Sequence, residues 1–446
     1  QTCALPISRQ LFMLDGDYKY LNYYEHALYN HILASQDPDM PGCVTYYTSL
    51  LPGSFKQYST PFDSFWCCVG TGMENHSKYA ESIYFKDNQE LLVNLYIPSR
   101  LHWKEKGLKL TLDTYFPESD TVTVRMDEIG SYTGTLLFRY PDWVSGDAVV
   151  RINGEPAQTE AHKGSYIRLL DSVKSGDVIT LVFTRNLYID YAKDEPHFGS
   201  VMYGPILLAG GLGTDDMPED RVIDNRACRE SLPAKNIPML VGPLTDLDSW
   251  IQCSSQHPLR FTVKNGGGQQ GVGLVPYFQM HHQRHTVYWK LYSPDEFVYR
   301  TRSLTDEVKI GDETDERKHA LQGENDSIYW HDYFWAKNTR FRMAKDGWFS
   351  YTLHINKTEQ KPYHLICRFW GDEPDTCQFD ILIDGNYLRT VSLNRKLYLT
   401  YVDDVYSIPA DWTRGKDKVN VTFRAAQGKN AGGLYELKIT SDTNYR

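Results

Sequence analysis

The chain of 446 residues lacks any uninterrupted run of 18 apolar residues, which excludes a membrane-spanning helix of the usual kind. It also lacks an excess of basic residues. There are 47 Lys and Arg against 57 Asp and Glu, and this formal net charge of −10 disfavours nucleic acid as a partner. Eight cysteines in so long a chain do not make a disulfide scaffold, and no internal repeat is present. With 41% hydrophobic residues, the chain has enough apolar material for packed cores, and its length predicts about three domains.

The chain begins with Gln1-Thr2-Cys3 and carries neither a starting Met nor a targeting segment. We therefore expect a processed chain or a fragment of a longer protein. On that expectation, the absence of a targeting segment does not indicate the cellular compartment.

Residues 1–90 show the spacing of helices. Apolar residues recur at helical intervals from Ile7 to Leu14 and stop at Asp15-Gly16-Asp17, and a second series runs from Tyr20 to Ile32 before Pro38. A Gly-, Pro- and Tyr-rich loop is expected over 42–64, and a third helix from about Thr71 through Ile83. Some 90 residues hardly close a domain of their own, so these helices indicate the end of a larger all-α domain.

From residue 91 the apolar period changes to two. Short alternating segments such as Leu108–Leu112 and Val122–Met126, and the Asn153-Gly154 turn, predict a β-sandwich over 91–190. The segment Val201–Gly210 reads as one buried strand within a mainly-β accessory module at 191–310. The polar run 311–318 is the best linker, and 319–446 is expected to form a C-terminal β-sandwich of a carbohydrate-binding kind. The predicted fold class is thus multidomain, helices first and β-sandwich modules after them.

The stretch from Ser64 to Tyr79 contains the candidate reactive and metal-binding residues. Cys67 and Cys68 are adjacent and stand just before a predicted helix N-terminus, where the helix dipole and free N–H groups lower a thiol pKa. A disulfide between neighbours would be strained, so the pair reads as thiols or metal ligands. Together with Cys3 and one further ligand, the pair would suit a tetrahedral zinc site. From spacing alone, two buried inert thiols are the simpler reading, because no CxxC framework is present.

The motif Phe65-Trp66-Cys67-Cys68-Val69-Gly70-Thr71-Gly72-Met73-Glu74-Asn75 resembles that of glycoside hydrolase families 127 and 146, the β-L-arabinofuranosidases. The resemblance implies that residues 1–90 are the end of an (α/α)6 catalytic barrel carrying this Cys-Cys motif. It implies β-sandwich modules after the barrel and a retaining hydrolase acting on arabinose-containing oligo- or polysaccharides. A polysaccharide substrate favours a periplasmic or secreted setting.

Carried over residue by residue, the resemblance makes Cys67 the nucleophile and a Zn²⁺ ligand. Cys68 and Cys3 would be further thiolate ligands, and Gln1 stands where the family has a Glu ligand. Tyr46 is the match for a tyrosine that faces the sugar, with ordinary packing as the alternative. The family's acid/base is a Glu that would precede Gln1. The chain taken alone is therefore expected to hydrolyse substrate poorly.

Other candidates have simpler explanations. Glu74 and Glu81 would share one face of the third helix, but capping and surface charge explain them. His281, His282 and His285 form a possible metal cluster without a fixed partner.

The rival to the hydrolase is a non-catalytic carbohydrate-binding or scaffold protein in which residues 91–446 do the work. Its candidate sugar platform is an aromatic cluster whose alternative role is core packing, namely Trp330, Tyr333, Phe334 and Trp335.

Overall fold

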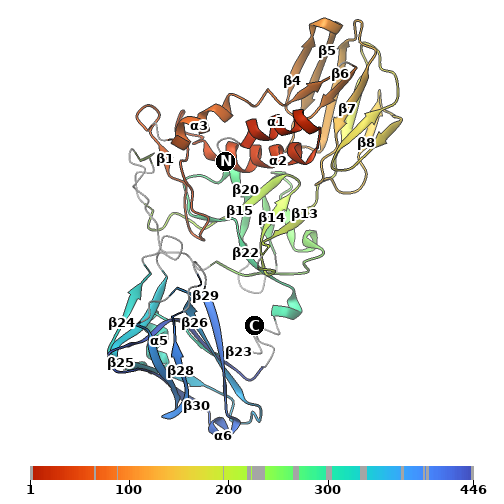
Figure 1. The fold of residues 1–446 in the computed structure, drawn as a ribbon. Coiled ribbons are helices and arrows are strands. Elements are labelled where there is room, and N and C mark those ends of the chain that lie inside the picture. The colour runs from red at the N-terminus through yellow and green to blue at the C-terminus, as the bar shows by residue number, and fades with distance from the viewer. Residues whose placement is uncertain are drawn as a thin grey trace. The chain divides into compact units, whose positions relative to one another are not determined.

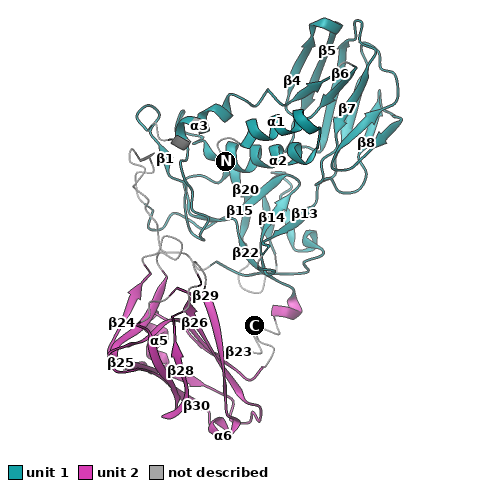
Figure 2. Ribbon diagram, in the orientation of Figure 1, with its two compact units in different colours: residues 1–293 teal, residues 294–446 magenta. Residues whose placement is uncertain are grey.

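A computed structural model describes residues 4–64, 67–87, 89–193, 195–217, 222–223, 237–264, 271–297, 304–331, 339–372, 376–394, 397 and 401–442. It divides into two compact units, residues 1–293 and 294–446 (Figure 2). The protein is multidomain and rich in β-structure, with few helices (Figure 1). No helix in the described ranges is both long and apolar enough to cross a membrane.

The first unit opens with two helices that lie side by side, α1 (Ala4–Asp15) and α2 (Lys19–Ala27), as the sequence predicts (Figure 1). The second continues as a π-helical turn, η1 (Leu28–Ile32), and a 3-10 turn, η2 (Leu33–Ser35). The third helix, α3, spans Cys67–His76. It ends seven residues before Ile83, where the prediction placed its end. Turns follow it and lead into the first strand of the sandwich.

A small core joins these helices to the segment that follows α3. It contains Leu5, Tyr24, Leu28 and Ile32 from the helices, and Ile83 and Leu95 from beyond α3. The sheets of the sandwich therefore begin on the same core that fixes the helices.

Two sheets form the sandwich that the alternating pattern predicts. The first has the order β10-β11-β7-β3-β2, and the second β4-β5-β6-β12-β8-β9. The strands of the first are β2 (Tyr84–Lys86), β3 (Glu90–Val93), β7 (Thr135–Arg139), β10 (Thr159–Ala161) and β11 (Tyr166–Leu169). Those of the second are β4 (Ser99–Trp103), β5 (Leu108–Thr114), β6 (Thr121–Glu128), β8 (Val149–Ile152), β9 (Glu155–Pro156) and β12 (Val178–Val182). A short 3-10 turn, η3 (Lys104–Lys106), joins β4 to β5.

The hairpin of β8 and β9 confirms its sequence signal. Asn153 and Gly154 both have positive φ, 51° and 90°, which a two-residue turn of this type requires.

A further sheet completes the first unit. Its order is β17-β22-β14-β15-β20-β19-β18, with β13 on β14 and β21 on β15. Its strands are β13 (Leu187–Tyr191), β14 (Phe198–Tyr203), β15 (Ile206–Gly211), β17 (Leu240–Val241), β18 (Ile251–Cys253), β19 (Phe261–Val263), β20 (Gly273–Pro276), β21 (His285–Thr286) and β22 (Trp289–Tyr292). Two 3-10 turns, η4 (Leu247–Ser249) and η5 (Tyr277–Gln279), flank it, and β1 (Tyr58–Ser59) pairs with β16 (Val222–Ile223).

The prediction of one strand over Val201–Gly210 is wrong. The chain turns at Gly204-Pro205 and returns as β15, so the segment is the centre of an antiparallel hairpin. Gly204 adopts φ +56°, which permits the turn inside an apolar run.

The second unit is built on one large antiparallel sheet of order β28-β27-β30-β25-β31-β26-β29, with β23 on β31 and β24 on β25. Its strands are β23 (Leu304–Val308), β24 (Gln322–Trp330), β25 (Arg340–His354), β26 (Tyr363–Trp370), β27 (Gln378–Ile383), β28 (Asn386–Ser392), β29 (Tyr401–Ile408), β30 (Lys418–Ala425) and β31 (Asn430–Thr440). The helix α6 (Ala410–Thr413) precedes β30. The unit has its own core, centred on Phe349, Phe369, Phe379 and Phe423.

The polar run 311–318 is not an extended linker. It forms the helix α5 (Glu313–Lys318), whose N-cap Asp312 accepts from the main-chain N–H groups of Thr314 and Asp315. Glu316 is buried and binds Arg342 and Tyr351 inside the second unit. The buried ion pair between Glu316 and Arg342 makes this segment part of the core of the second unit. The sequence does not show this, because the segment contains only polar residues.

Candidate active site

The helix α3 begins at the adjacent cysteines. Cys67 and Cys68 are its first two residues, so both stand in the first turn, where main-chain N–H groups lack intrahelical partners and the dipole is positive. The side chains of both cysteines lie outside what the structure describes, as do Cys3 and Gln1. The predicted ligand set therefore stays a prediction. The predicted start near Thr71 is four residues too late.

A cavity of about 460 Å³ lies between α3 and the other parts of the first unit. Gly72 and Asn75 of α3 line it, and so does Tyr46, the residue predicted to face a sugar. The other walls come from α2, η1, the loop 44–50 and the third sheet, including His26, His31, Asp190, Ser200, Met202, Tyr277 and Tyr288. The structure thus brings Tyr46 and the cysteine-bearing helix to one concave site, the size of site that small ligands use.

Burial controls the electrostatics of this cavity. Desolvation lowers the pKa of His31 to about 4, with the nearby His26 as a smaller cause, and burial likewise lowers the pKa of His26. Both imidazoles are therefore neutral at pH 7 and can donate or accept hydrogen bonds. Among the described residues, Nδ1 of His31 is buried without a hydrogen-bond partner.

The π-helical turn positions this wall of the cavity. Asn30 in η1 is buried, its amide donates to the carbonyl of Pro205 (2.8 Å), and its carbonyl accepts from the N–H of Leu207 (2.8 Å). These bonds connect η1 to the turn and first residues of β15. Such π-helical turns are rare and are frequently found at functional sites. No sequence signal marks Asn30, Ser200 or Met202 as lining residues, because they come from elements far apart in the chain.

The two carboxylates proposed on one helix face are not on one helix. Glu81 lies beyond the end of α3 and forms an ion pair with Lys78 (3.3 Å) near the surface. The prediction of a shared face at i and i+7 is wrong, because α3 ends at His76.

The three histidines do not form one metal cluster. Nδ1 of His281 accepts from the hydroxyl of Tyr58 (2.6 Å), and its Nε2 lies 2.7 Å from the carbonyl of Phe278. Because a carbonyl only accepts, Nε2 carries the proton and no ring nitrogen remains for a metal. His282 instead lies beside Asp37 and Asp39, at 3.2 and 3.0 Å.

The aromatic cluster of the second unit is described only in part. Trp330 at the end of β24 is 47% exposed, and the Arg340 guanidinium lies 4.6 Å from its ring centre. Tyr333, Phe334 and Trp335 lie outside the described residues.

Comparison with models of known protein families gives four matches, one after another along the chain. Residues 2–81 match the GH127 catalytic domain of β-L-arabinofuranosidases, and residues 90–185 match the GH127 middle domain. Residues 188–291 match a domain of unknown function (DUF4986), and residues 301–440 match a family of unknown function (DUF6805). A search among curated protein sequences gives no match.

Several solved structures are similar to parts of this chain at low sequence identity. A glycoside hydrolase is 21% identical, with a TM-score of 0.51, 66% of this chain covered and 52% of that chain. A GH127 β-arabinofuranosidase is 19% identical (TM-score 0.49, 66% and 50% covered). A GH127 β-L-arabinofuranosidase from Geobacillus stearothermophilus T6 is 14% identical (TM-score 0.37, 95% and 49% covered). The chain spans about half the length of these structures.

The two GH127 matches take in the cysteine-bearing helix beside the cavity and the two-sheet sandwich that follows it. The chain belongs to the GH127 β-L-arabinofuranosidase family and carries the C-terminal part of its catalytic domain. The resemblance found in the Cys-Cys motif is confirmed at this level.

Proposed function

We propose that this chain is part of a retaining β-L-arabinofuranosidase in which Cys67 is the nucleophile. The observation that carries the proposal is that Cys67 opens α3 within the GH127 catalytic match, while Gly72 and Asn75 of the same helix line the cavity that also holds Tyr46. On this proposal α1, α2 and α3 are the last helices of an (α/α)6 barrel.

The proposed reaction is a double displacement. The Cys67 sulfur attacks the anomeric carbon, the bond to the leaving oxygen breaks, and a carboxylic acid supplies the proton that this oxygen needs. Water then displaces the sulfur, with loss of a proton to the same carboxylate, and arabinose leaves with net retention. The first turn of α3 favours the thiolate form of Cys67 that this attack requires.

Zinc fits the donor set proposed for this site. Cys3, Cys67 and Cys68 offer three thiols, the ligands that zinc prefers, and Gln1 offers an amide oxygen, a weaker donor than the Glu of the family. Bound zinc would keep its thiol ligands deprotonated at neutral pH. Neutral His26 and His31 and the hydroxyl of Tyr46 would then bind the sugar hydroxyls.

We also propose that the 446-residue chain by itself turns substrate over poorly. The family's acid/base Glu would precede Gln1, so no residue of this chain takes over its role in the proposal. Extension of the chain upstream to the start of its reading frame is expected to restore turnover.

Replacement of Cys67 by Ala in the extended chain tests the nucleophile. We expect release of arabinose from a β-L-arabinofuranoside to fall by at least about 10³-fold, because the covalent route is lost. The matched control is Cys253→Ala, since Cys253 is an exposed free cysteine outside the cavity. Zinc content is measured in each variant.

Four outcomes decide the matter. Loss of turnover in Cys67→Ala alone supports the nucleophile. Turnover that survives in Cys67→Ala overturns it. An extended chain that contains zinc but cleaves no arabinoside would support the metal site and overturn the proposed substrate. Sugar binding that survives deletion of residues 1–90 would support the carbohydrate-binding alternative.

A further inference from the structure

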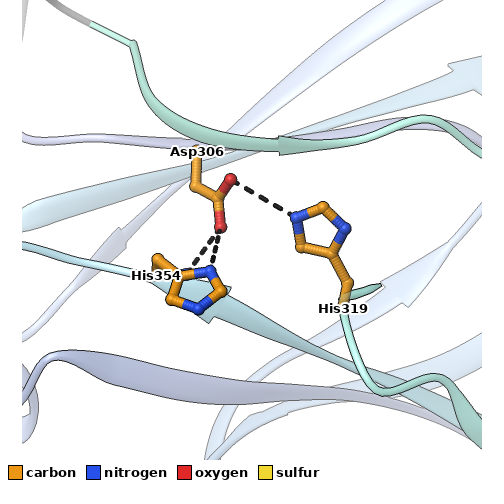
Figure 3. Close-up of side chains that lie close together, drawn as sticks. All are labelled: Asp306, His319 and His354. Carbon is orange, nitrogen blue, oxygen red and sulfur yellow. Dashed lines mark hydrogen bonds and ion pairs between the residues drawn. The ribbon is translucent and has the colours of Figure 1, made fainter. Parts of the chain in front are cut away.

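Two histidines and one carboxylate of the second unit converge on one point, far in sequence from the cysteine motif. Asp306, His319 and His354 each present a ligand atom, and these three atoms lie within 4.8 Å of one another (Figure 3). Nε2 of His319 is 3.3 Å from Oδ1 of Asp306, and Nδ1 of His354 is 3.2 Å from Oδ2.

The hydrogen bonds of His319 fix which nitrogen faces the carboxylate. The ring is 1% exposed, and its Nδ1 lies 2.7 Å from the main-chain carbonyl oxygen of Asp315. Because a carbonyl oxygen only accepts, Nδ1 carries a proton, and Nε2 is the ring nitrogen that faces Asp306. Nε2 of His319 and the Asp306 carboxylate, 3.3 Å apart, need a positive charge between them, which either a proton on Nε2 or a metal ion supplies.

The surroundings are those of a ligand shell. Histidines that bind metals usually donate the other ring N–H to a main-chain carbonyl or a carboxylate, as His319 does toward Asp315. The Asp306 carboxylate is held in turn by the main-chain N–H groups of His354 (2.6 Å) and Glu307 (3.0 Å). Nitrogen and oxygen ligands around tetrahedral zinc stand about 3.3 Å apart. His319 lies at this spacing from Oδ1 of Asp306 and His354 from Oδ2, so the two histidines face the two oxygens of one carboxylate.

Three separate elements build this cluster. Asp306 follows an irregularity in the pairing of β23 with β31, which redirects a side chain. His319 is the C-cap of α5, and its carbonyl accepts from the N–H of Thr352 in β25, two residues before His354. The His354 side chain is 60% exposed and so leaves a path for an ion from solvent.

We propose that Asp306, His319 and His354 bind a divalent transition-metal ion of the zinc class, with a solvent molecule completing a tetrahedral shell. The ion would connect β23 and the end of α5 to β25. This site is independent of the hydrolase proposal, since its ligands are imidazoles and a carboxylate in the second unit.

Titration of Zn²⁺ and Co²⁺ into the full chain tests the site by calorimetry and visible absorption. We expect one equivalent of Co²⁺ to bind with d–d bands and without the thiolate charge-transfer band that a cysteine site gives. His354→Ala should weaken this equivalent by more than about 100-fold, beyond what loss of an outer-shell partner costs. Because His354 is exposed, its replacement leaves the core of the unit intact, and Asp306→Asn, which keeps the shape of the acceptor, is the second variant.

The matched control is His162→Ala, because His162 is also an exposed histidine beside a carboxylate, 3.3 Å from Glu160, but has no second imidazole in that pair. It should bind metal as the wild-type chain does. The proposal is overturned if the wild-type chain shows no thiolate-free cobalt equivalent, or if His354→Ala and Asp306→Asn both retain it. His319 would then be an imidazolium paired with Asp306.

Discussion

Among single residues, Lys56 is a buried amine of the first unit whose pKa is strongly shifted. Its side chain is 2% exposed. Its Nζ donates to the main-chain carbonyl of Tyr277 (3.0 Å) and lies 4.2 Å from the centre of the Tyr277 aromatic ring. Burial lowers the pKa of Lys56 to about 7, although the Asp37 carboxylate opposes the shift. The Lys56 charge in turn adds to burial in lowering the pKa values of His281 and His285 to about 4.

This residue gives a stability prediction with a definite sign. The unfolded chain holds the Lys56 proton up to its ordinary pKa of 10.5, whereas the folded chain releases it near 7. Folding stability from this group therefore rises with pH between about 7 and 10.5, by up to about 1.4 kcal/mol per pH unit. Urea unfolding across this pH range should show the wild-type free energy of unfolding rise relative to that of Lys56→Met. The stability advantage of Lys56→Met should therefore shrink by up to about 1.4 kcal/mol per pH unit.

Lys104→Met, at an exposed lysine, serves as the control and should leave the slope unchanged. A stability difference between wild type and Lys56→Met that is constant from pH 7 to 10 would mean that the buried ammonium keeps its proton.

Among the elements, α2 and β7 are joined by a buried ionic network. Arg139 of β7 is fully buried and binds the Glu25 carboxylate, and its Nε donates to the carbonyl of Asn94 (2.8 Å). Nε1 of Trp143 donates to the second oxygen of Glu25 (2.7 Å). These bonds attach the helices that line the cavity to the sandwich, so their geometry affects the candidate active site.

Loss of one partner should therefore be costly. Glu25→Gln leaves Arg139 as a buried charge without its counterion and should lower the free energy of unfolding by about 3–5 kcal/mol, measured by urea denaturation. The double variant Glu25→Gln with Arg139→Met should recover part of this loss. A surface pair, Lys109 and Glu128 (2.6 Å apart), gives the control, and Glu128→Gln should change stability little. Equal effects of the two Gln variants would contradict the assignment of the network as a structural connection.

The sequence predicts elements where a local rule decides them. Alternation gives β5 and β6, and the Asn153-Gly154 turn gives the β8–β9 hairpin. It fails where a contact with distant residues decides, as in the hairpin at Gly204-Pro205 and in α5, whose Glu316 is held by Arg342. The Cys-Cys motif is local and therefore visible. The cavity walls are not, because Asn30 and Met202 meet only in the folded unit.

In the whole molecule, each unit has a hydrophobic core of its own. In the first unit this core includes Phe138 and Phe183, and in the second Phe349 stacks on Phe423 with ring centres 5.0 Å apart. The same division separates the two metal proposals, since thiol ligands belong to residues 1–293 and the Asp306–His319–His354 cluster to residues 294–446. A sequence reading does not find that cluster, because its members are 13 and 35 residues apart and meet only where the end of α5 lies beside the folded sheet.

Separate cores predict separate unfolding. Scanning calorimetry should show two unfolding transitions, and Phe349→Ala should lower the midpoint temperature of only one of them, because Phe349 lies in the core of one unit. A buried Phe→Ala change costs about 3–5 kcal/mol, which corresponds to a fall of about 6–20 °C for a unit of this size. Phe138→Ala, in the other core, should lower only the other transition, and Zn²⁺ bound at Asp306, His319 and His354 should raise the transition that Phe349→Ala lowers. A single transition that both variants shift would mean that the two units unfold as one, and metal that raises only the Phe138-sensitive transition would place the bound ion in the first unit.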